Sequence, residues 1–206
     1  KFSLFKNKLR VEATGFYFKL NNALVTRKDS TNADYFVNAG NTQQKGIEIS
    51  ADYSIVFKNT FLEYLMFKSS YTQSNFKYGD FKKGTVSLSG KYLPSVPKNI
   101  VSVLADVQFK KGIYFNSTYY YADKIFLDDA NAVFAEAYNL LGCRIGWKVN
   151  LKARNKLSFY FGVDNLLNEK YSLGNDINAA GGRYYNAAPA RNYYAGIAFE
   201  WSKSKK

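Results

Sequence analysis

The sequence contains no histidine among its 206 residues and only one cysteine. Without histidine it has no Ser-His or Cys-His nucleophilic pair, no imidazole general base and no histidine metal ligand. Cys143 cannot form an internal disulfide, and it falls in phase with Leu141, Ile145 and Trp147, which indicates a small outward-facing apolar residue. Glycine-rich nucleotide-binding patterns are also missing. We therefore expect no enzyme, no resident cofactor and no metal site.

Long apolar runs are missing as well. No segment approaches the roughly 18 consecutive apolar residues of a membrane-spanning helix. The mean hydropathy of -0.33 does not distinguish a soluble protein from an outer-membrane barrel, because half of each barrel strand faces water. Lys1-Phe2-Ser3-Leu4 does not open a charged-then-apolar secretion leader, so either a leader was removed or the chain begins within a longer protein, and the strand count below favours the second.

Negative charge is scarce, since 29 Lys and Arg against 16 Asp and Glu give a formal charge of +13. A nucleic-acid groove would need a contiguous basic stripe with exposed aromatic residues between the cations. Here the lysines are scattered and collect in apparent turns, as at Lys110 and Lys111, while the aromatic residues lie inside alternating segments. We expect these cations at the rim of a membrane protein and no nucleic-acid partner.

Apolar and polar residues alternate along much of the sequence, as the two-residue side-chain period of a strand requires. In residues 45–57 the apolar side chains share one face, and the opposite face carries Glu48 and Asp52. The same pattern predicts a strand that ends the folded part of the chain. The candidate strands span residues 9–26, 45–57, 61–73, 99–109, 113–124, 138–149, 157–163 and the closing segment up to Trp201.

The positions of the charged residues in the alternation predict which face of each strand contacts water. An arginine on the lipid face near the middle of a membrane costs roughly 2 to 4 kcal/mol, so Arg144 is expected to face the lumen of a barrel. Glu63 and Lys68 fall in opposite phases, so one of them needs a bulge or a rim position, and we expect Glu63 near a turn. The predicted lumen-facing residues are Glu48, Asp52, Asp106, Arg144 and Lys148.

Short and long connections alternate strictly between these segments. Short ones follow residues 5, 57, 109 and 149, whereas long ones span residues 27–44, 74–98, 125–137 and 172–190. Tight periplasmic turns and extended extracellular loops are typical of outer-membrane barrels. The sequence therefore predicts an all-β protein, an antiparallel transmembrane β-barrel segment in a bacterial outer membrane.

Five short motifs carry a resemblance to a known family. They are Asn38-Ala39-Gly40 with Lys45-Gly46-Ile47-Glu48, Leu93-Pro94-Ser95-Val96-Pro97-Lys98, Asp129-Ala130-Asn131, Val163-Asp164-Asn165-Leu166-Leu167-Asn168-Glu169-Lys170-Tyr171, and the closing segment Gly182 to Trp201. In this order along the chain they resemble the C-terminal part of a TonB-dependent outer-membrane receptor of the siderophore-receptor type.

The resemblance implies a barrel of about 22 strands filled by an N-terminal plug, which imports scarce metal chelates with energy relayed through TonB. Counting eight full strands plus the end of a ninth at Lys1 to Phe5, we expect residues 1–201 to be the C-terminal part of that barrel, with the plug and about thirteen strands outside this chain. Outer-membrane lipid, lipopolysaccharide and the chelate are the implied partners. Residues 202–206 are expected to be a disordered basic tail.

The last strand and the loops supply the candidate functional residues. The family usually ends at a terminal aromatic residue that assembly machinery reads, which makes the outward face of the last strand a candidate assembly signal, formed by Tyr193, Ala195, Ile197, Phe199 and Trp201. Guanidinium groups and tyrosine hydroxyls suit anionic chelates, although the same residues also suit loop shaping and interfacial anchoring. The candidate ligand-binding residues are Arg183, Tyr184, Tyr185, Arg191, Tyr35 and Phe36.

Two alternatives remain open at the level of sequence. Eight strands can close a small autonomous outer-membrane barrel that acts as an anchor or adhesin. A soluble barrel that binds a small ligand would also show alternation, but it would have to bury Trp147, Phe159, Phe161 and Trp201 in a core.

Overall fold

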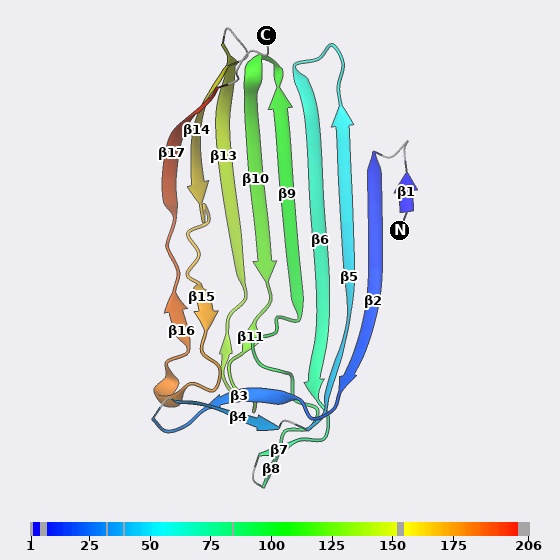
Figure 1. Cartoon of the computed structure of the whole chain (residues 1–206), viewed down its shortest axis with the longest axis vertical. Helices are drawn as coiled ribbons and strands as arrows, with labels where there is room; N and C mark the ends of the chain where they lie inside the picture. Colours follow the sequence, from blue (N-terminus) through cyan, green and yellow to red (C-terminus); the bar gives the residue numbers. More distant parts are fainter. Residues whose placement is uncertain are drawn as a thin grey trace.

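The computed structural model describes residues 2–4, 8–31, 33–38, 40–83, 85–151 and 155–201. Nine of its strands form one antiparallel sheet in the order β1-β2-β5-β6-β9-β10-β13-β14-β17, drawn side by side in Figure 1. These strands are β1 (Phe2–Leu4), β2 (Leu9–Leu20), β5 (Thr42–Val56), β6 (Leu62–Tyr78), β9 (Asn99–Phe109), β10 (Ile113–Ala122), β13 (Tyr138–Asn150), β14 (Lys156–Asp164) and β17 (Asn192–Glu200).

The prediction of an antiparallel β-sheet with eight full strands and the end of a ninth is confirmed. The edge strands are β1 and β17, and among the described residues neither pairs with the other, so this sheet does not close into a barrel by itself. No helix among the described residues is long and apolar enough to cross a membrane.

The register of the strands separates two chemically different faces. Paired residues in adjacent strands share a face, so Ile145 lies beside Phe115 and Phe161, whereas Arg144 lies beside Asn116 and Gly162. We call these the apolar face and the polar face of the sheet. The register places Glu48, Asp52, Asp106, Arg144 and Lys148 together on the polar face.

The outward residues of the last strand lie on the apolar face, as their phase predicts. Tyr193 pairs with Val163, Ile197 with Phe159, and Phe199 with Leu157. Trp201 follows the end of β17 and is 70% exposed. The basic tail predicted at residues 202–206 lies outside the described residues.

Short turns gather at one end of the sheet, which Figure 1 draws at the top. The β9–β10 connection is a single 3-10 turn, η1 (Lys110–Gly112). Next to the β5–β6 turn, the pairing of β6 with β9 shifts register between Leu62 and Tyr64, which leaves Glu63 in a bulge. The expected position of Glu63 near a turn is therefore confirmed, and Lys68 lies on the polar face opposite Asp52.

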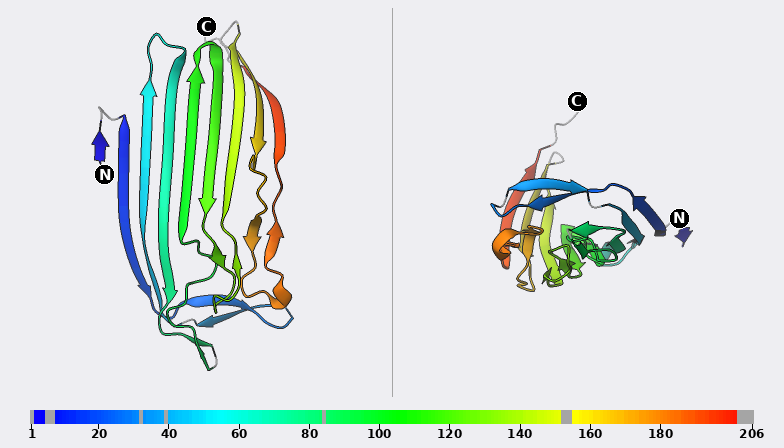
Figure 2. Two further views of the ribbon diagram at one scale, coloured as in Figure 1. Left: turned by 180° about the vertical axis from the view of Figure 1, so that it is seen from behind. Right: turned by 90° about the horizontal axis from the view of Figure 1, so that it is seen from below.

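Long loops gather at the other end, and each contains a small hairpin that the alternation pattern did not predict. The β3–β4 hairpin reaches from the end of β2 across the open side of the curved sheet, as both views of Figure 2 show. The small strands are β3 (Leu24–Lys28), β4 (Asp34–Asn38), β7 (Lys82–Lys83), β8 (Val86–Ser87), β11 (Ile125–Phe126), β12 (Phe134–Ala135), β15 (Ser172–Asn175) and β16 (Tyr185–Ala187).

Three predicted boundaries at this end are wrong. The strand predicted over residues 9–26 ends at Leu20, because Asn22 adopts a left-handed conformation with φ of 55° and the chain turns before β3. The strand predicted to end at residue 73 continues to Tyr78, and β5 begins at Thr42 rather than residue 45. In the β6 extension the aromatic residues Phe76 and Tyr78 occupy polar-face positions, so the apolar phase of residues 61–73 does not continue into it, and the first residues of β5 are polar.

The best-buried apolar residues lie among the loops. Tyr78, Phe81 and Leu88 form a cluster against Leu93, and Leu127 is fully buried. Polar contacts then join loops that are far apart in sequence, since the Tyr78 hydroxyl donates to Asp129 Oδ1 at 2.6 Å. This packing gives the loop end a fixed shape and positions the cavity described next.

Candidate functional site

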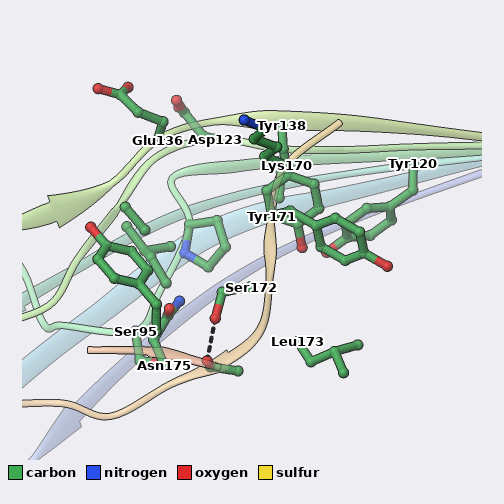
Figure 3. A pocket seen from close by; sticks show the side chains of 16 residues that line it. Ser95, Tyr120, Asp123, Glu136, Tyr138, Lys170, Tyr171, Ser172, Leu173 and Asn175 are labelled. Carbon is green, nitrogen blue, oxygen red and sulfur yellow. Dashed lines mark hydrogen bonds between the residues drawn. The ribbon is translucent and has the colours of Figure 1, made fainter. Parts of the chain in front are cut away.

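A cavity of about 470 Å³ lies at the loop end of the sheet (Figure 3). Its floor is the polar face where β10 ends and β13 begins, with Tyr120, Ala122 and Tyr138 as lining residues. Its walls come from the β11–β12 hairpin, the β15–β16 hairpin and residues 95–97. Small-molecule sites typically occupy about 300 to 1,000 Å³, so this cavity has the size of a ligand subsite.

Tyrosine rings form much of the cavity surface. The Tyr120 and Tyr138 rings lie 6.0 Å apart, and the Tyr138 and Tyr171 rings stack with centroids 5.1 Å apart. Tyr185 also lines the cavity and donates a hydrogen bond to the backbone oxygen of Phe134 at 3.2 Å. Packed rings of this kind hold a rigid surface with exposed π faces.

Three charged side chains line the cavity, namely Asp123, Glu136 and Lys170. The Asp123 carboxylate is held in place, because it accepts hydrogen bonds from Asn99 Nδ2 at 2.8 Å and from the Lys124 backbone N–H at 3.0 Å. Glu136 and Lys170 are exposed. Asn99 also accepts a hydrogen bond from the Tyr71 hydroxyl on the apolar face, so the Asp123 carboxylate lies on that side of the sheet.

One lining side chain presents an acceptor without a donor. Asn175 Oδ1 is buried and accepts no hydrogen bond from any described residue. The neighbouring Ser172 hydroxyl is already engaged, since it donates to Gly174 and accepts from the Asn186 N–H at 2.9 Å. A buried polar atom without a partner is rare in folded proteins, and this oxygen has almost no accessible surface to offer a ligand.

A second polar cluster lies on the same face nearer the short turns, around a cavity of about 150 Å³. The Arg144 guanidinium lies 5.8 Å from the Tyr114 ring and 5.6 Å from the Tyr160 ring, and Nη2 donates to Asn116 Oδ1 at 3.3 Å. Gly146 lies directly below the Tyr114 ring, where a side chain would overlap that ring. Arg144 is thus held on the polar face by aromatic side chains.

The structure separates the predicted ligand-binding residues. Tyr185 lines the cavity, and the Tyr184 ring lies 6.5 Å from it in an edge-on arrangement. Arg183 and Arg191 are exposed residues of the same loop and do not line the cavity. Tyr35 and Phe36 lie on β4 in the hairpin that crosses the open side of the sheet, and Phe36 is 72% exposed.

The sequence argument missed most of the lining residues. Tyr120 and Tyr138 carried a detectable signal, because both occupy polar-face positions at strand ends next to long loops. Glu136, Lys170 and Asn175 carried none, since their positions depend on how the loops fold onto the strand ends. Among the described residues no group of three or more Asp, Glu, Cys or His side chains is arranged to hold a metal ion.

Three solved structures with a similar fold are receptors for iron chelates. The siderophore receptor PiuA from Acinetobacter baumannii is 18% identical with a TM-score of 0.68, over 95% of this chain and 26% of that one. The ferric preacinetobactin receptor BauA from the same organism is 15% identical with a TM-score of 0.71, over 95% and 28%. The ferric-catecholate import receptor Fiu from E. coli K12 is 19% identical with a TM-score of 0.68, over 96% and 26%.

The chain therefore spans about a quarter of the length of these structures. At these identities the likeness shows the fold, an antiparallel wall of a receptor barrel. The sequence model described as the TonB-dependent receptor-like β-barrel matches residues 1–166. The family and these structural neighbours are receptors and transporters rather than enzymes. The chain belongs to the TonB-dependent receptor-like β-barrel family.

Proposed function

We propose that this chain forms C-terminal barrel strands of an outer-membrane receptor that imports a ferric siderophore or a similar metal chelate. The observation that carries the proposal is the two-faced sheet, whose polar face ends in a ligand-sized cavity beneath the long loops. In this arrangement the apolar face contacts lipid, the polar face lines the lumen, and the cavity lies on the extracellular side.

The membrane orientation follows from the two ends of the sheet. On this proposal the short turns face the periplasm and the long loops face the exterior, where they meet lipopolysaccharide. Trp147, on the apolar face near the Lys110–Gly112 turn, donates its indole N–H to the Lys111 backbone oxygen at 2.8 Å. This geometry suits an aromatic residue at the membrane interface.

Residues 1–201 are proposed to act as one part of a barrel of about 22 strands. A plug domain supplied by the rest of the receptor would fill the lumen and contact TonB. The exposed apolar row of β17, from Tyr193 to Trp201, is proposed as the signal that directs barrel assembly. The lumen-facing role remains proposed for Glu48, Asp52, Asp106, Arg144 and Lys148.

Among the candidate ligand residues, Tyr185 has the strongest support because it lines the cavity. Tyr184 is proposed to orient that ring through its edge-on contact. Arg183 and Arg191 on the neighbouring loop, and Tyr35 and Phe36 on the crossing hairpin, are proposed to meet the chelate as it enters.

Iron uptake tests this function directly. A strain that lacks the gene containing this chain is supplied with radioactive iron as ferric citrate, a ferric tricatecholate or a ferric trihydroxamate. We expect the restored gene to raise cell-associated iron for at least one chelate, and removal of TonB to abolish the gain. Equal uptake by the deleted and restored strains for all three chelates would refute the proposed import.

A further inference from the structure

Lysines gather on the outward side of the sheet at its loop end, just beyond the apolar side chains. On β5 the last apolar residue of that face is Ile47, and the next side chain on the same face is Lys45. One step further, Lys19 pairs with Gln43 and Gln43 pairs with Lys77, which forms a row across β2, β5 and β6. A two-residue step is about 7 Å, so on tilted strands these lysines rise about 5 to 10 Å above the apolar residues.

The sign of the charge distinguishes this surface from the polar face. On the polar face both signs occur together, since Asp52 lies opposite Lys68 and Asp106 shares a small cavity with Arg144. At the outward positions of β2, β5 and β6 nearest the long loops, every charged side chain is a lysine. A surface of one sign attracts a partner of the opposite sign, so this surface favours an anion.

A pocket of about 210 Å³ continues this surface toward β9 and β11. Tyr92 lies on the same face as Lys77, because the two residues pair in an antiparallel bridge. Asp123 lies on that side as well, through its hydrogen bond from Asn99. The pocket therefore opens outward rather than into the lumen. Its lining residues are Tyr92, Val96, Lys98, Asp123, Lys124 and Phe126.

Aromatic rings hold two of the ammonium groups in place. Lys77 Nζ lies 4.7 Å from the centroid of the Tyr92 ring, and Lys124 Nζ lies 4.8 Å from that of Phe134. The Tyr92 ring in turn stacks on Phe126 with centroids 5.9 Å apart. A ring face attracts an ammonium group without using up its three N–H donors, which stay available to an anion. Preorganised side chains also lose less conformational entropy on binding.

One carboxylate, that of Asp123, opposes these cations. Hydrogen bonds from Asn99 Nδ2 at 2.8 Å and from the Lys124 backbone N–H at 3.0 Å already stabilise its charge. The ammonium groups of Lys98 and Lys124 in the lining, and of Lys77 over the Tyr92 wall, outnumber it. The pocket and its edge therefore keep a net positive charge.

We infer that this pocket, with Lys77 at its edge, binds a phosphate group of lipopolysaccharide in the outer leaflet. The acyl chains would then lie against the apolar face below, where Tyr71, Val101 and Tyr121 form a row. A sugar headgroup with several anionic groups at different heights matches lysines on successive rows better than a phospholipid with its single phosphate. This inference rests on the membrane orientation proposed above and is independent of the chelate.

Two lipid probes that differ only in phosphate test this inference. The first is lipid A with both of its phosphates, and the second is the same lipid after both are removed. Binding to the purified full-length receptor in detergent is measured by native mass spectrometry over a concentration series, with phosphatidylglycerol as a phospholipid reference. We expect bisphosphorylated lipid A to bind about tenfold more tightly than either the dephosphorylated lipid or phosphatidylglycerol.

Matched variants identify the pocket as the source of the preference. Lys77→Gln and Lys98→Gln should each weaken binding of bisphosphorylated lipid A about threefold, and Asp123→Asn should strengthen it. Lys110→Gln removes the same charge in the turn at the opposite end of the sheet and should leave binding unchanged. Retention of the folded barrel band in unheated gels confirms that each variant is folded.

The outcomes separate this inference from the import function. Equal binding of the two forms of lipid A, equally tight binding of phosphatidylglycerol, or an equal effect of Lys98→Gln and Lys110→Gln would overturn the inference. If receptor-dependent iron uptake persists in that case, the import function stands without this lipid site. If no chelate is imported while the preference for phosphate depends on Lys98, the lipid site stands and the import function fails.

Discussion

At the scale of single residues, the sheet depends on glycines that leave space for a neighbour. On the polar face Tyr114, Tyr160 and Tyr194 lie over Gly146, Gly196 and Gly162 respectively, and in each pair the ring covers the backbone of an adjacent strand. The Tyr114 and Tyr160 rings in turn hold Arg144 on that face. The glycines therefore leave the space in which the aromatic side chains lie, and through them the charged one.

Gly46 provides the sharpest test of this close approach. A Cβ atom at this position would overlap the backbone oxygen of Gln73 and the ring of Phe16, and the backbone cannot move aside as a side chain can. We expect Gly46→Ala to destabilise the folded receptor by about 1 to 3 kcal/mol, measured by urea unfolding in detergent. Gly15→Ala on β2 is the matched control, because nothing lies within 4 Å of its added methyl group, and it should leave stability nearly unchanged.

At the scale of elements, the side chains of each long strand alternate between the apolar face and the polar face of the sheet. Val103 and Ser102 are neighbours in β9, yet their partners across β10 are Tyr119 on the apolar face and Tyr120 on the polar face. If the apolar face contacts lipid, adjacent positions must differ greatly in their tolerance of charge.

An arginine at each of these two positions measures that difference. Val103→Arg should cost about 2 to 4 kcal/mol and reduce the fraction of folded barrel, because the guanidinium would lie in hydrocarbon. Ser102→Arg places the same group one residue away on the polar face and should cost under about 1 kcal/mol. The folded fraction in outer-membrane preparations gives the readout. An equal loss for both variants would contradict the assignment of the two faces.

The turn of the β3–β4 hairpin contains a carboxylate, that of Asp29, whose hydrogen bonds depend on pH. Asp29 accepts hydrogen bonds from the Thr31 hydroxyl at 2.6 Å and from the backbone N–H groups of Thr31 and Ala33. The hydrogen bond from the Thr31 side chain, followed by those from the Ala33 and Thr31 backbones, lowers the pKa of this carboxyl below 3.8.

A lowered pKa means that the carboxylate stabilises the turn above pH 3.8 and that this stabilisation is lost as the pH falls through the folded-state pKa. We therefore expect the Ala33 amide to exchange slowly with solvent near neutral pH and faster after Asp29→Asn, with hydrogen exchange as the measurement. Asp34→Asn, a neighbouring carboxyl change, is the comparison. An Ala33 exchange rate that Asp29→Asn leaves unchanged would contradict this account of the turn.

Sequence reasoning succeeded where one face of a strand must be apolar. That requirement predicts the opposite phases of Arg144 and Ile145 and a turn position for Glu63, as the strand register has them. It failed beyond the apolar band, where β6 continues to Tyr78 with its aromatic side chains, Phe76 and Tyr78, on the polar-face side instead of the apolar one. The cavity was largely unpredictable for the same reason, because Glu136 and Asn175 reach it through loop folding rather than strand phase.

At the scale of the whole molecule, loops from distant parts of the sequence form one structure over the end of the sheet. Tyr78 at the end of β6 donates to Asp129 in the β11–β12 loop, and the Asp129 N–H donates to Asn178 Oδ1 at 3.1 Å. Asn131 bonds to both the N–H and the carbonyl of Tyr92. These contacts fix the loops around the cavity relative to each other, although the sheet below them does not close into a barrel.

Removal of one hydroxyl tests whether this network holds the loops independently of the strands. Tyr78→Phe takes a donor from the buried Asp129 carboxylate, and such a loss costs about 1 to 3 kcal/mol. Because the strands keep their own ladder hydrogen bonds, we expect faster proteolysis of the loops with an unchanged thermal transition of the barrel. Tyr71→Phe is the control, since its hydroxyl donates to Asn99 at an exposed site on the apolar face and should leave loop proteolysis unchanged. A fall in barrel stability equal to the gain in loop cleavage would show instead that loops and strands unfold as one cooperative unit.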